Sequence, residues 1–257
     1  MSGNKFGGER LESKSNLSRN NLLEHLARYR LVANNKNGVG IALDIGCGAG
    51  HGSNYLSNKF KQVYGVDLSP EAIDYAKKSW DTTNINFLCG SGTEIPFGDN
   101  FFDVVTAFEV FEHIEDWPKF LEEISRVVKK EGLVYISTPN KDIYNPHTKK
   151  PVNPHHFFEM RIGEFKDALN KFFVIKKFYG QRTPVYNDHW VWKIVNPILY
   201  IFRFFISYKL NNKIKLSIIN WIKPSLEDSD IVFYEDNESI KKSRFLVAVC
   251  SKKKYGE

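Results

Sequence analysis

The chain has 257 residues, of which 42% are hydrophobic, so it is long enough to bury the core of one large domain. Its formal net charge of +6 permits anionic partners and equally fits a solvated, lysine-rich surface. Three widely separated cysteines, Cys47, Cys89 and Cys250, exclude a disulfide framework or metal cluster and indicate a reducing compartment. Because residues 1–10 lack the apolar segment of a signal peptide, we expect a cytoplasmic protein.

The first predicted elements are a helix and a buried strand. Residues 17–31 place apolar side chains at helical spacing and are predicted to form an amphipathic helix. Residues 39–45 form an apolar run typical of a buried parallel strand. This run ends in Gly46, Gly48 and Gly50, and glycine lets a backbone turn sharply and approach a ligand. With a helix predicted over 52–60, the arrangement is typical of a nucleotide-type cofactor site.

The spacing and charge of this loop indicate which cofactor it holds. The dinucleotide fingerprint needs a glycine where the chain has His51. Asp44, just before the loop, would repel a pyrophosphate but suits a cofactor that carries an ammonium and a sulfonium. The next predicted strand, 63–67, ends in Asp67, whose carboxylate can accept hydrogen bonds from both hydroxyls of a ribose. The sequence therefore favours S-adenosylmethionine (SAM).

The remaining predicted elements alternate between helix and strand. Ser69 caps a helix over 70–80, and Asp116 caps a helix over 117–130 that Gly132 ends. We expect further strands over 85–90, 102–108, 133–138 and 172–179, a helix over 163–170, and a last strand over 244–250. Helices that alternate with buried strands predict an α/β fold with a mostly parallel sheet.

The segment 183–242, between the last two predicted strands, differs in composition. It has no acidic residue from His189 to Leu226, where basic and aromatic residues are interleaved. Lys193, Pro197 and Arg203 interrupt its apolar run, which argues against a membrane-spanning helix. We expect a helical insertion that serves as a lid, as a homodimer interface or, through 190–222, as a peripheral contact with the inner face of a membrane.

Several motifs resemble those of the class I SAM-dependent methyltransferases, in particular the methyltransferase 11/12-like group. The motifs are Leu43 to Gly50, Gly65 to Ser69, Glu94 to Asp103 and Phe108 to Ile114. The resemblance covers residues 19–180 and the last strand. It implies one domain over 1–257 with a doubly wound, mostly parallel, seven-stranded Rossmann-like sheet. The last strand would be antiparallel between strands five and six, with the helical insertion before it.

The resemblance also implies the residues of the cofactor site. Asp67 would hold the ribose, the glycine loop would approach the methionine part, and Asp44 would assist the ammonium indirectly. Ser91 stands where the family usually has an acid that binds adenine, so backbone contacts at Gly92 and Thr93 are the alternative. The expected cofactor-binding set is Asp44, Gly46, Cys47, Gly48, Gly50, Asp67, Leu68, Gly92, Thr93, Phe108 and Glu109.

Methyl transfer to an oxygen requires a base or a metal ion to take up the acceptor's proton. The candidate catalytic bases are His113, His155 and His156, because histidine titrates near neutral pH. Glu109, Glu112 and His113 have a spacing that converges on a helical turn. That motif resembles the divalent-cation site of some quinone-ring O-methyltransferases. The alternative is that it only shapes the cofactor pocket, so the sequence leaves the metal open.

The acceptor is indicated by resemblance alone. The segments 137–141 and 153–156 and the end of the leading helix look like methyltransferases of bacterial surface-glycan and lipid-linked saccharide synthesis. We therefore expect O-methylation of a sugar or sugar phosphate in polysaccharide biosynthesis, with a glycan or small molecule as the acceptor.

Three other functions were weighed against sugar O-methylation. Methylation of a quinone or another lipid is the alternative within the class. A non-catalytic SAM-binding partner would have a damaged cofactor site, whereas Asp44, Asp67 and the glycines are all present. Nucleic acid is not expected as a partner, because the motif of base N-methyltransferases is absent after the fourth predicted strand.

Overall fold

The computed structural model describes residues 16–35, 40–148, 150–151, 153–182 and 231–253. The chain divides into two compact units, of which the larger comprises Met1–Arg10, Arg28–Arg182 and Phe233–Glu257. The other comprises Leu11–Ala27 and Thr183–Val232. The predicted insertion lies outside the described residues as far as 230, including all of 190–222. Among the helices that the structure describes, none combines the length and the apolar content that crossing a bilayer requires.

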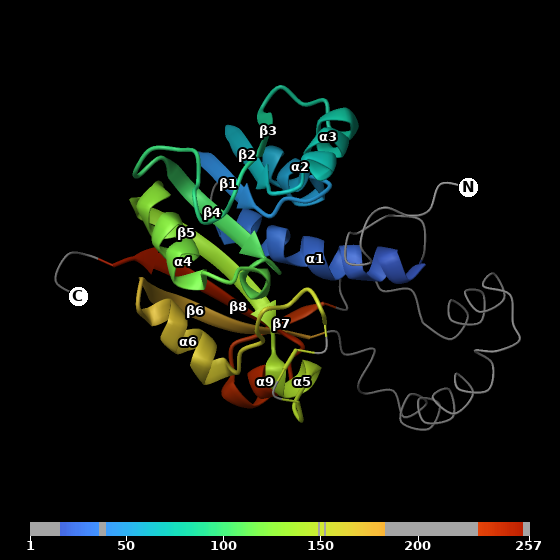
Figure 1. The fold of residues 1–257 in the computed structure, drawn as a ribbon, viewed down its shortest axis with the longest axis vertical. Helices are drawn as coiled ribbons and strands as arrows, with labels where there is room; N and C mark the ends of the chain where they lie inside the picture. The colour runs from blue at the N-terminus through green and yellow to red at the C-terminus, as the bar shows by residue number, and fades with distance from the viewer. Residues whose placement is uncertain (1–15, 36–39, 149, 152, 183–230, 254–257) are drawn as a thin grey trace, which may run out of the picture. The chain divides into compact units, whose positions relative to one another are not determined.

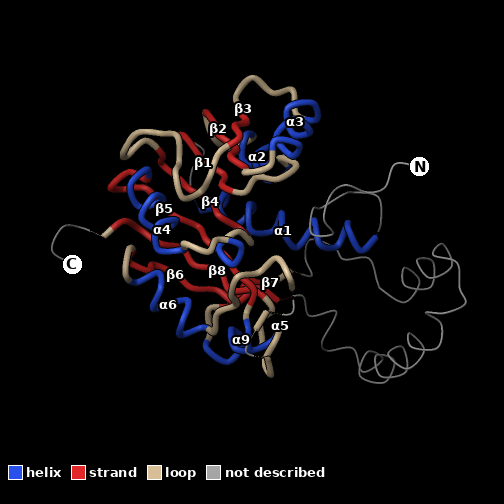
Figure 2. The backbone as a smooth tube through the Cα atoms, in the orientation of Figure 1, coloured by secondary structure: helices blue, strands red, loops and turns tan. Residues whose placement is uncertain are grey.

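Eight strands form one sheet in the order β3-β2-β1-β4-β5-β8-β6-β7 (Figures 1 and 2). Neighbouring strands among β1 to β5 pair in parallel, whereas β8 runs antiparallel between β5 and β6. This confirms the mostly parallel sheet and the place of its last strand, but the sheet has eight strands rather than the seven expected. The strands are β1 (Ile41–Ile45), β2 (Gln62–Asp67), β3 (Ile85–Cys89), β4 (Phe102–Phe108), β5 (Val128–Pro139), β6 (Phe173–Arg182), β7 (Val232–Tyr234) and β8 (Phe245–Lys252).

The edge strand β7 was not predicted, because it lies within a segment whose composition suggested helix. The ring of Phe233 in β7 contacts Tyr179 of the neighbouring strand β6 edge to face, with centroids 6.0 Å apart. β7 thereby covers part of the outer edge of β6, which would otherwise have no neighbouring strand on that side. The end of the expected helical insertion is therefore a short strand followed by a one-turn helix.

Helices lie on both faces of the sheet. They are α1 (Asn16–Asn35), α2 (His51–Ser57), α3 (Pro70–Ser79), α4 (Trp117–Val127), α5 (Lys141–Tyr144), α6 (Ile162–Asn170) and α9 (Asn237–Lys241), with the 3₁₀ turn η1 (Phe111–His113). Leu43 and Ile45 of β1 join a core that includes Phe120 of α4 and Phe165 of α6. Figure 1 shows α4 and α6 on the same face. Because side chains alternate along a strand, Asp44 points to the opposite face, where α2 packs.

Two helix starts agree with their predicted caps. The Ser69 hydroxyl accepts the Ala72 N–H at 3.2 Å, and the Asp116 carboxylate accepts the Lys119 N–H at the same distance. Each cap satisfies one of the backbone donors that a helix leaves unpaired in its first turn. The starts of α3 and α4 were therefore encoded locally.

The predicted end of the second of these helices was wrong. α4 stops at Val127, three residues early, and Val128 adopts extended geometry, with φ −74° and ψ 139°. Val128 is fully buried and pairs with Phe102 of β4, so it begins β5. Gly132 lies inside that strand and does not end the helix. A buried β-branched residue gains more from sheet pairing here than from another helical turn.

We predict that Gly180→Ala destabilises the fold by about 1–3 kcal/mol, as overpacking typically does. A Cβ at Gly180 in β6 would lie 2.3 Å from the Ser243 hydroxyl and 2.7 Å from the Ile240 Cα, so backbone must move. The control is Gly163→Ala in α6, where a Cβ meets nothing within 4 Å. Urea unfolding measures both variants. Equal stabilities of the two would contradict the packing described for β6.

Candidate functional site

The loop after β1, Gly46 to Gly50, is held in a conformation that favours glycine. Gly46, Gly48 and Gly50 have φ of 68°, 52° and 80°, all left-handed. The N–H groups of Gly46 and Cys47 both donate to the Val66 carbonyl, at 2.7 and 3.1 Å. A Cβ at Gly46 would lie 2.2 Å from Val110, whereas one at Gly48 would meet nothing within 4 Å. The loop is thus packed against protein at its start and open at Gly48.

Asp67 joins this loop to the end of β2. One carboxylate oxygen accepts the Gly48 N–H at 2.8 Å, and the other accepts the Ser69 N–H at 2.9 Å. Each oxygen has a second lone pair that can accept from a hydroxyl. The neighbouring Leu68 is 74% exposed, which leaves an apolar surface beside a half-buried carboxylate. This pairing suits the ribose and the flat base of a nucleoside.

The turn after β3, residues 90–93, is the part of the expected cofactor site that would meet the adenine base. The Ser91 hydroxyl accepts the Thr93 N–H at 3.1 Å and lies 2.8 Å from the Thr93 hydroxyl. A Cβ at Gly92 would lie 2.7 Å from the Phe120 ring, so the turn packs closely on α4. Because the Ser91 hydroxyl is engaged within its own turn, the backbone at 92–93 is the better candidate for contacting a base.

Asp44 lies beneath the loop and is fully buried. Its carboxylate accepts three hydroxyl hydrogen bonds, from Tyr29 at 2.9 Å, Ser53 at 2.7 Å and Thr106 at 2.8 Å. Burial raises the pKa of Asp44 to about 6, although these three bonds lower it. Burial also raises the pKa of the Cys47 thiol well above its usual range, so this thiol is held neutral.

The carboxyl end of β4 differs from expectation at Glu109. This residue has a left-handed φ of 56°, and η1 begins only at Phe111. The Glu109 N–H donates to the Ser137 hydroxyl at 3.2 Å, and that hydroxyl donates back to the Glu109 carboxylate at 2.7 Å. Arg28 lies 3.8 Å from the same carboxylate. Glu109 is therefore fixed against β5 and Arg28 rather than on one helical turn with Glu112 and His113.

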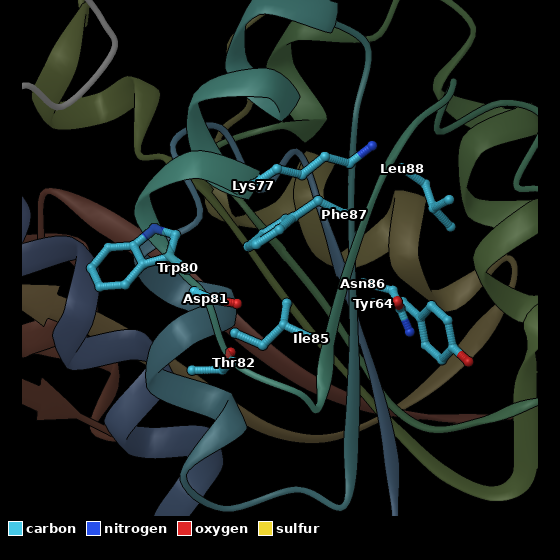
Figure 3. A pocket seen from close by; sticks show the side chains of 9 residues that line it. All are labelled: Tyr64, Lys77, Trp80, Asp81, Thr82, Ile85, Asn86, Phe87 and Leu88. Atoms are coloured by element: carbon cyan, nitrogen blue, oxygen red, sulfur yellow. The ribbon is translucent and has the colours of Figure 1, made fainter.

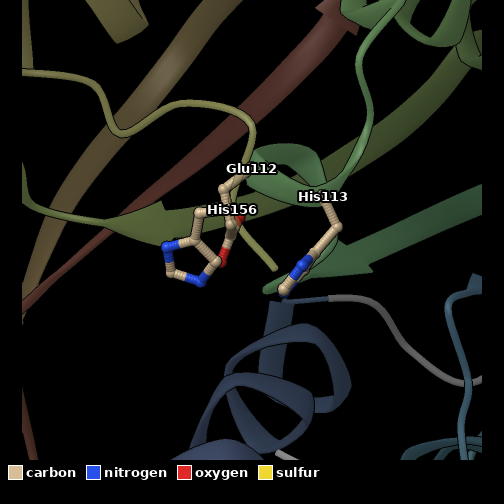
Figure 4. Close-up of side chains that lie close together, drawn as sticks. All are labelled: Glu112, His113 and His156. Atoms are coloured by element: carbon tan, nitrogen blue, oxygen red, sulfur yellow. The ribbon is translucent and has the colours of Figure 1, made fainter. Parts of the chain in front are cut away.

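The group that does converge consists of Glu112, His113 and His156, with one ligand-type atom from each within 4.8 Å of the others (Figure 4). The two imidazole rings meet edge to face, with centroids 4.8 Å apart. Glu112 is buried and accepts the Thr138 hydroxyl at 3.2 Å. Burial, followed by the nearby charge of Glu109, raises the Glu112 pKa well above its usual range, which favours the neutral carboxyl.

Hydrogen bonds distinguish the roles of the histidines. Nδ1 of His113 lies 2.9 Å from the His155 carbonyl, which can only accept, so a neutral His113 ring has its lone pair on Nε2. Nδ1 of His156 contacts the buried Glu159 carboxylate at 3.1 Å, and its Nε2 lies 3.0 Å from the Asn153 amide nitrogen. His156 is therefore oriented through both nitrogens, whereas the exposed His155 contributes its backbone.

Sequence reasoning missed the side chains that support these groups. Tyr29, Ser53 and Thr106 surround Asp44, and Glu159 and Asn153 orient His156. Tyr29 lies at the end of the leading helix, which the sequence analysis described by its apolar face and its resemblance and not as a partner of Asp44. The single local signal was the three-residue spacing of His156 and Glu159, which is too common to identify a pair.

A hollow of about 470 Å³ lies between α3 and the edge strand β3 (Figure 3). It shares no residue with the glycine loop and does not include Asp44 or Asp67. We therefore do not assign the cofactor to it. Its lining residues are Tyr64, Lys77, Trp80, Asp81, Thr82, Ile85, Asn86, Phe87 and Leu88.

Comparison with known proteins matches residues 43–136 to the family described as "Methyltransferase domain". A "probable S-adenosylmethionine-dependent methyltransferase" of Mycobacterium tuberculosis is 32% identical over 127 residues, which cover 49% of this chain and 46% of that protein. A ubiquinone biosynthesis O-methyltransferase of Bradyrhizobium diazoefficiens is 40% identical over 102 residues, 39% of this chain and 40% of that protein. The chain thus spans less than half the length of these two relatives.

The solved structure of the YcgJ protein of Bacillus subtilis is similar to this chain, with a TM-score of 0.56 and 19% identity. The match covers 89% of this chain and 99% of that one. At this identity the likeness shows the fold alone. Together the comparisons show that residues 43–136 resemble a methyltransferase domain and that the chain has the fold of these solved structures. The cofactor that this family and fold imply is SAM.

The observed residues fit that cofactor. The open side of Gly48 leaves room for a ligand against the loop backbone. Asp67 retains lone pairs for ribose hydroxyls, and the Asp44 carboxylate provides a negative charge for a cationic amino-acid end. These residues would hold SAM by its ribose and its methionine part.

We predict that Asp67→Ala weakens SAM binding at least about 100-fold, because two hydroxyl bonds to a carboxylate contribute about 3 kcal/mol or more. The control is Asp74→Ala, which removes an exposed carboxylate from α3. Isothermal titration calorimetry measures both affinities. An unchanged affinity for SAM in Asp67→Ala would move the cofactor away from β2.

Proposed function

We propose that this chain is a SAM-dependent O-methyltransferase in which His113 takes up the proton of the acceptor hydroxyl. The observation that carries the proposal is the group of Glu112, His113 and His156, in which η1, just after β4, meets the loop that follows β5. Ligands of open α/β sheets bind outside the carboxyl ends of their strands. A base at this edge would meet an acceptor placed next to the glycine loop.

When bound, SAM supplies a methyl group on a sulfonium and a neutral thioether as the leaving group. Nε2 of His113 would take up the proton of the acceptor hydroxyl as that oxygen receives the methyl group and the thioether leaves. The His155 carbonyl keeps the proton of the resting ring on Nδ1. We assign His156 as a positioning residue, because Glu159 and Asn153 engage both of its nitrogens.

The acceptor class that we propose first is a sugar or sugar phosphate. The group that would face the acceptor is polar, because Glu112, His113 and Asn153 all lie there. Lys150, in the same loop as His156, is exposed and carries a positive charge that suits an anionic substituent such as a phosphate. A hydroxylated acceptor needs such donors and acceptors more than it needs apolar contact.

A second acceptor class, a quinone-like phenol or another lipid, is favoured by a different observation. Ile143, Tyr144 and Phe157 are 42%, 40% and 57% exposed, in and near the loop that follows β5. One relative is named a ubiquinone biosynthesis O-methyltransferase. Its match covers only part of either chain, so it supports the chemistry more than the acceptor.

Transfer of label from methyl-labelled SAM tests the proposed acceptor. The chain is incubated with lysate fractions that separate saccharides, lipid-linked saccharides, other lipids, RNA and protein. Alkali-stable label in a saccharide fraction is the expected result. Label in the quinone or phenolic lipid fraction would favour the second class, and label only in RNA or protein would overturn O-methylation of a small acceptor.

We predict that His113→Gln lowers kcat at least about 100-fold, the typical contribution of a general base, with little change in SAM affinity. His156→Ala also lowers turnover more than SAM binding, because the supporting contacts in this cluster are lost. His147→Gln, which changes an exposed histidine after α5, is the matched control. Steady-state rates and calorimetry measure the two quantities. A normal rate in His113→Gln would remove it as the base.

We predict that chelation with EDTA leaves activity intact. Each member of the converging group already has a hydrogen-bond partner in the protein. Glu112 accepts from Thr138, His113 contacts the His155 carbonyl, and His156 contacts Glu159. The alternative is a divalent cation bound by Glu112, His113 and His156. Loss of activity that Mg²⁺ or Mn²⁺ restores would establish that alternative and replace Glu109 in the predicted ligand set by His156.

A further inference from the structure

The buried carboxylate of Asp44 depends on hydroxyl groups from three separate elements. Tyr29 of α1, Ser53 of α2 and Thr106 of β4 all donate to it within 2.9 Å. An ionised carboxylate without such donors is strongly disfavoured inside a protein. The charge at this position is therefore a property of the whole network rather than of Asp44 alone.

Tyr29 is held in place on several sides. Its side chain is buried, and its ring meets Phe108 edge to face with centroids 5.0 Å apart. A Cβ at Gly52 would lie 2.0 Å from the Tyr29 ring, so the ring occupies space that only glycine leaves. The adjacent Arg28 donates to Gln181 at 2.6 Å and stacks on Phe245. These contacts fix the hydroxyl of Tyr29 at the carboxylate.

Among the described residues, three other titratable groups act on or share the surroundings of Asp44. They are Tyr29 from α1, Cys47 from the glycine loop and Asp67 from β2, whereas Ser53 and Thr106 do not titrate. Burial and the charge of Asp67 raise the pKa of Asp44 to about 6, and the three hydroxyl bonds lower it. The pKas of the Tyr29 phenol and the Cys47 thiol are both raised, so both groups stay neutral at pH 7. Removing one hydroxyl would raise the pKa of Asp44 further, so that a larger share of its carboxyl groups would be protonated at pH 7.

We propose that Tyr29 is a positioning residue that keeps Asp44 ionised beneath the loop and thereby makes the site prefer SAM to its product S-adenosylhomocysteine. The two compounds share the same amino-acid end and nucleoside, so those contacts cancel in the ratio of their affinities. They differ in the sulfonium charge of SAM. The negative charge of Asp44 attracts that sulfonium in SAM and has no corresponding charge to attract in S-adenosylhomocysteine. The proposal rests on the cofactor site of the proposed function and not on the acceptor.

The test is the ratio of SAM to S-adenosylhomocysteine affinity between pH 5.5 and 8.5, measured by calorimetry on the full chain. In the native protein we expect the preference for SAM to fall as the pH drops through about 6. In Tyr29→Phe, which keeps the ring, we expect the same fall about one pH unit higher, since a bond to a charged group shifts a pKa by about that much. At pH 7 such a shift lowers the ionised fraction of Asp44 from about nine-tenths to about one half, so the ratio should fall by about twofold, and by about fourfold at pH 6.

The control is Tyr64→Phe, whose ring lies among Phe97, Phe101 and Phe102 away from Asp44 and should leave the pH profile unchanged. Thr106→Val removes a second hydroxyl and repeats the test if Tyr29→Phe does not fold. An unchanged ratio in both hydroxyl variants, or equal losses of both affinities without a pH shift, would overturn the proposal. Absence of SAM binding by the native chain would instead overturn the cofactor assignment itself.

Discussion

The constraint on which the site depends is a carboxylate buried under a loop of left-handed glycines. Asp44 is fully buried, and an ionised group there requires hydrogen bonds from the elements around it. Three hydroxyls, from α1, α2 and β4, meet that requirement. Because α1, α2 and β4 must each bring a hydroxyl to Asp44, their packing and the position of the glycine loop above it depend on each other.

The carboxyl edge of the sheet divides into two regions with different chemistry. On the β1–β2 side, backbone amides and Asp67 form a rigid surface whose shape depends on Gly46, Gly48 and Gly50. On the β4–β5 side, Glu109 and Glu112 are held by Ser137 and Thr138, and His113 faces a loop that closes back onto it. One region suits a fixed nucleoside, and the other suits proton transfer.

Local signals predicted much of the fold. The apolar runs that became β1, β2 and β4, and the caps at Ser69 and Asp116, are encoded in a few neighbouring residues. The end of α4 was missed because Val128 is decided by sheet pairing with Phe102, which no local pattern contains. The short edge strand β7 was missed because it lies at the end of a segment whose composition suggested helix.

The candidate site was predictable in part. The glycines and Asp67 follow a spacing with a physical meaning, so their places could be inferred before any coordinates. Glu109 was expected to share a helical turn with Glu112, but its left-handed backbone breaks that turn. The partnership of Tyr29 with Asp44 and the convergence of His156 with His113 join segments that only the folded chain brings together.

A structure of the full chain with S-adenosylhomocysteine bound tests the central claim most directly. The account predicts ribose hydroxyls on the Asp67 carboxylate and the amino-acid end against the backbone of Gly46 to Gly50. A ligand bound instead in the hollow between α3 and β3, with the glycine loop empty, would contradict it.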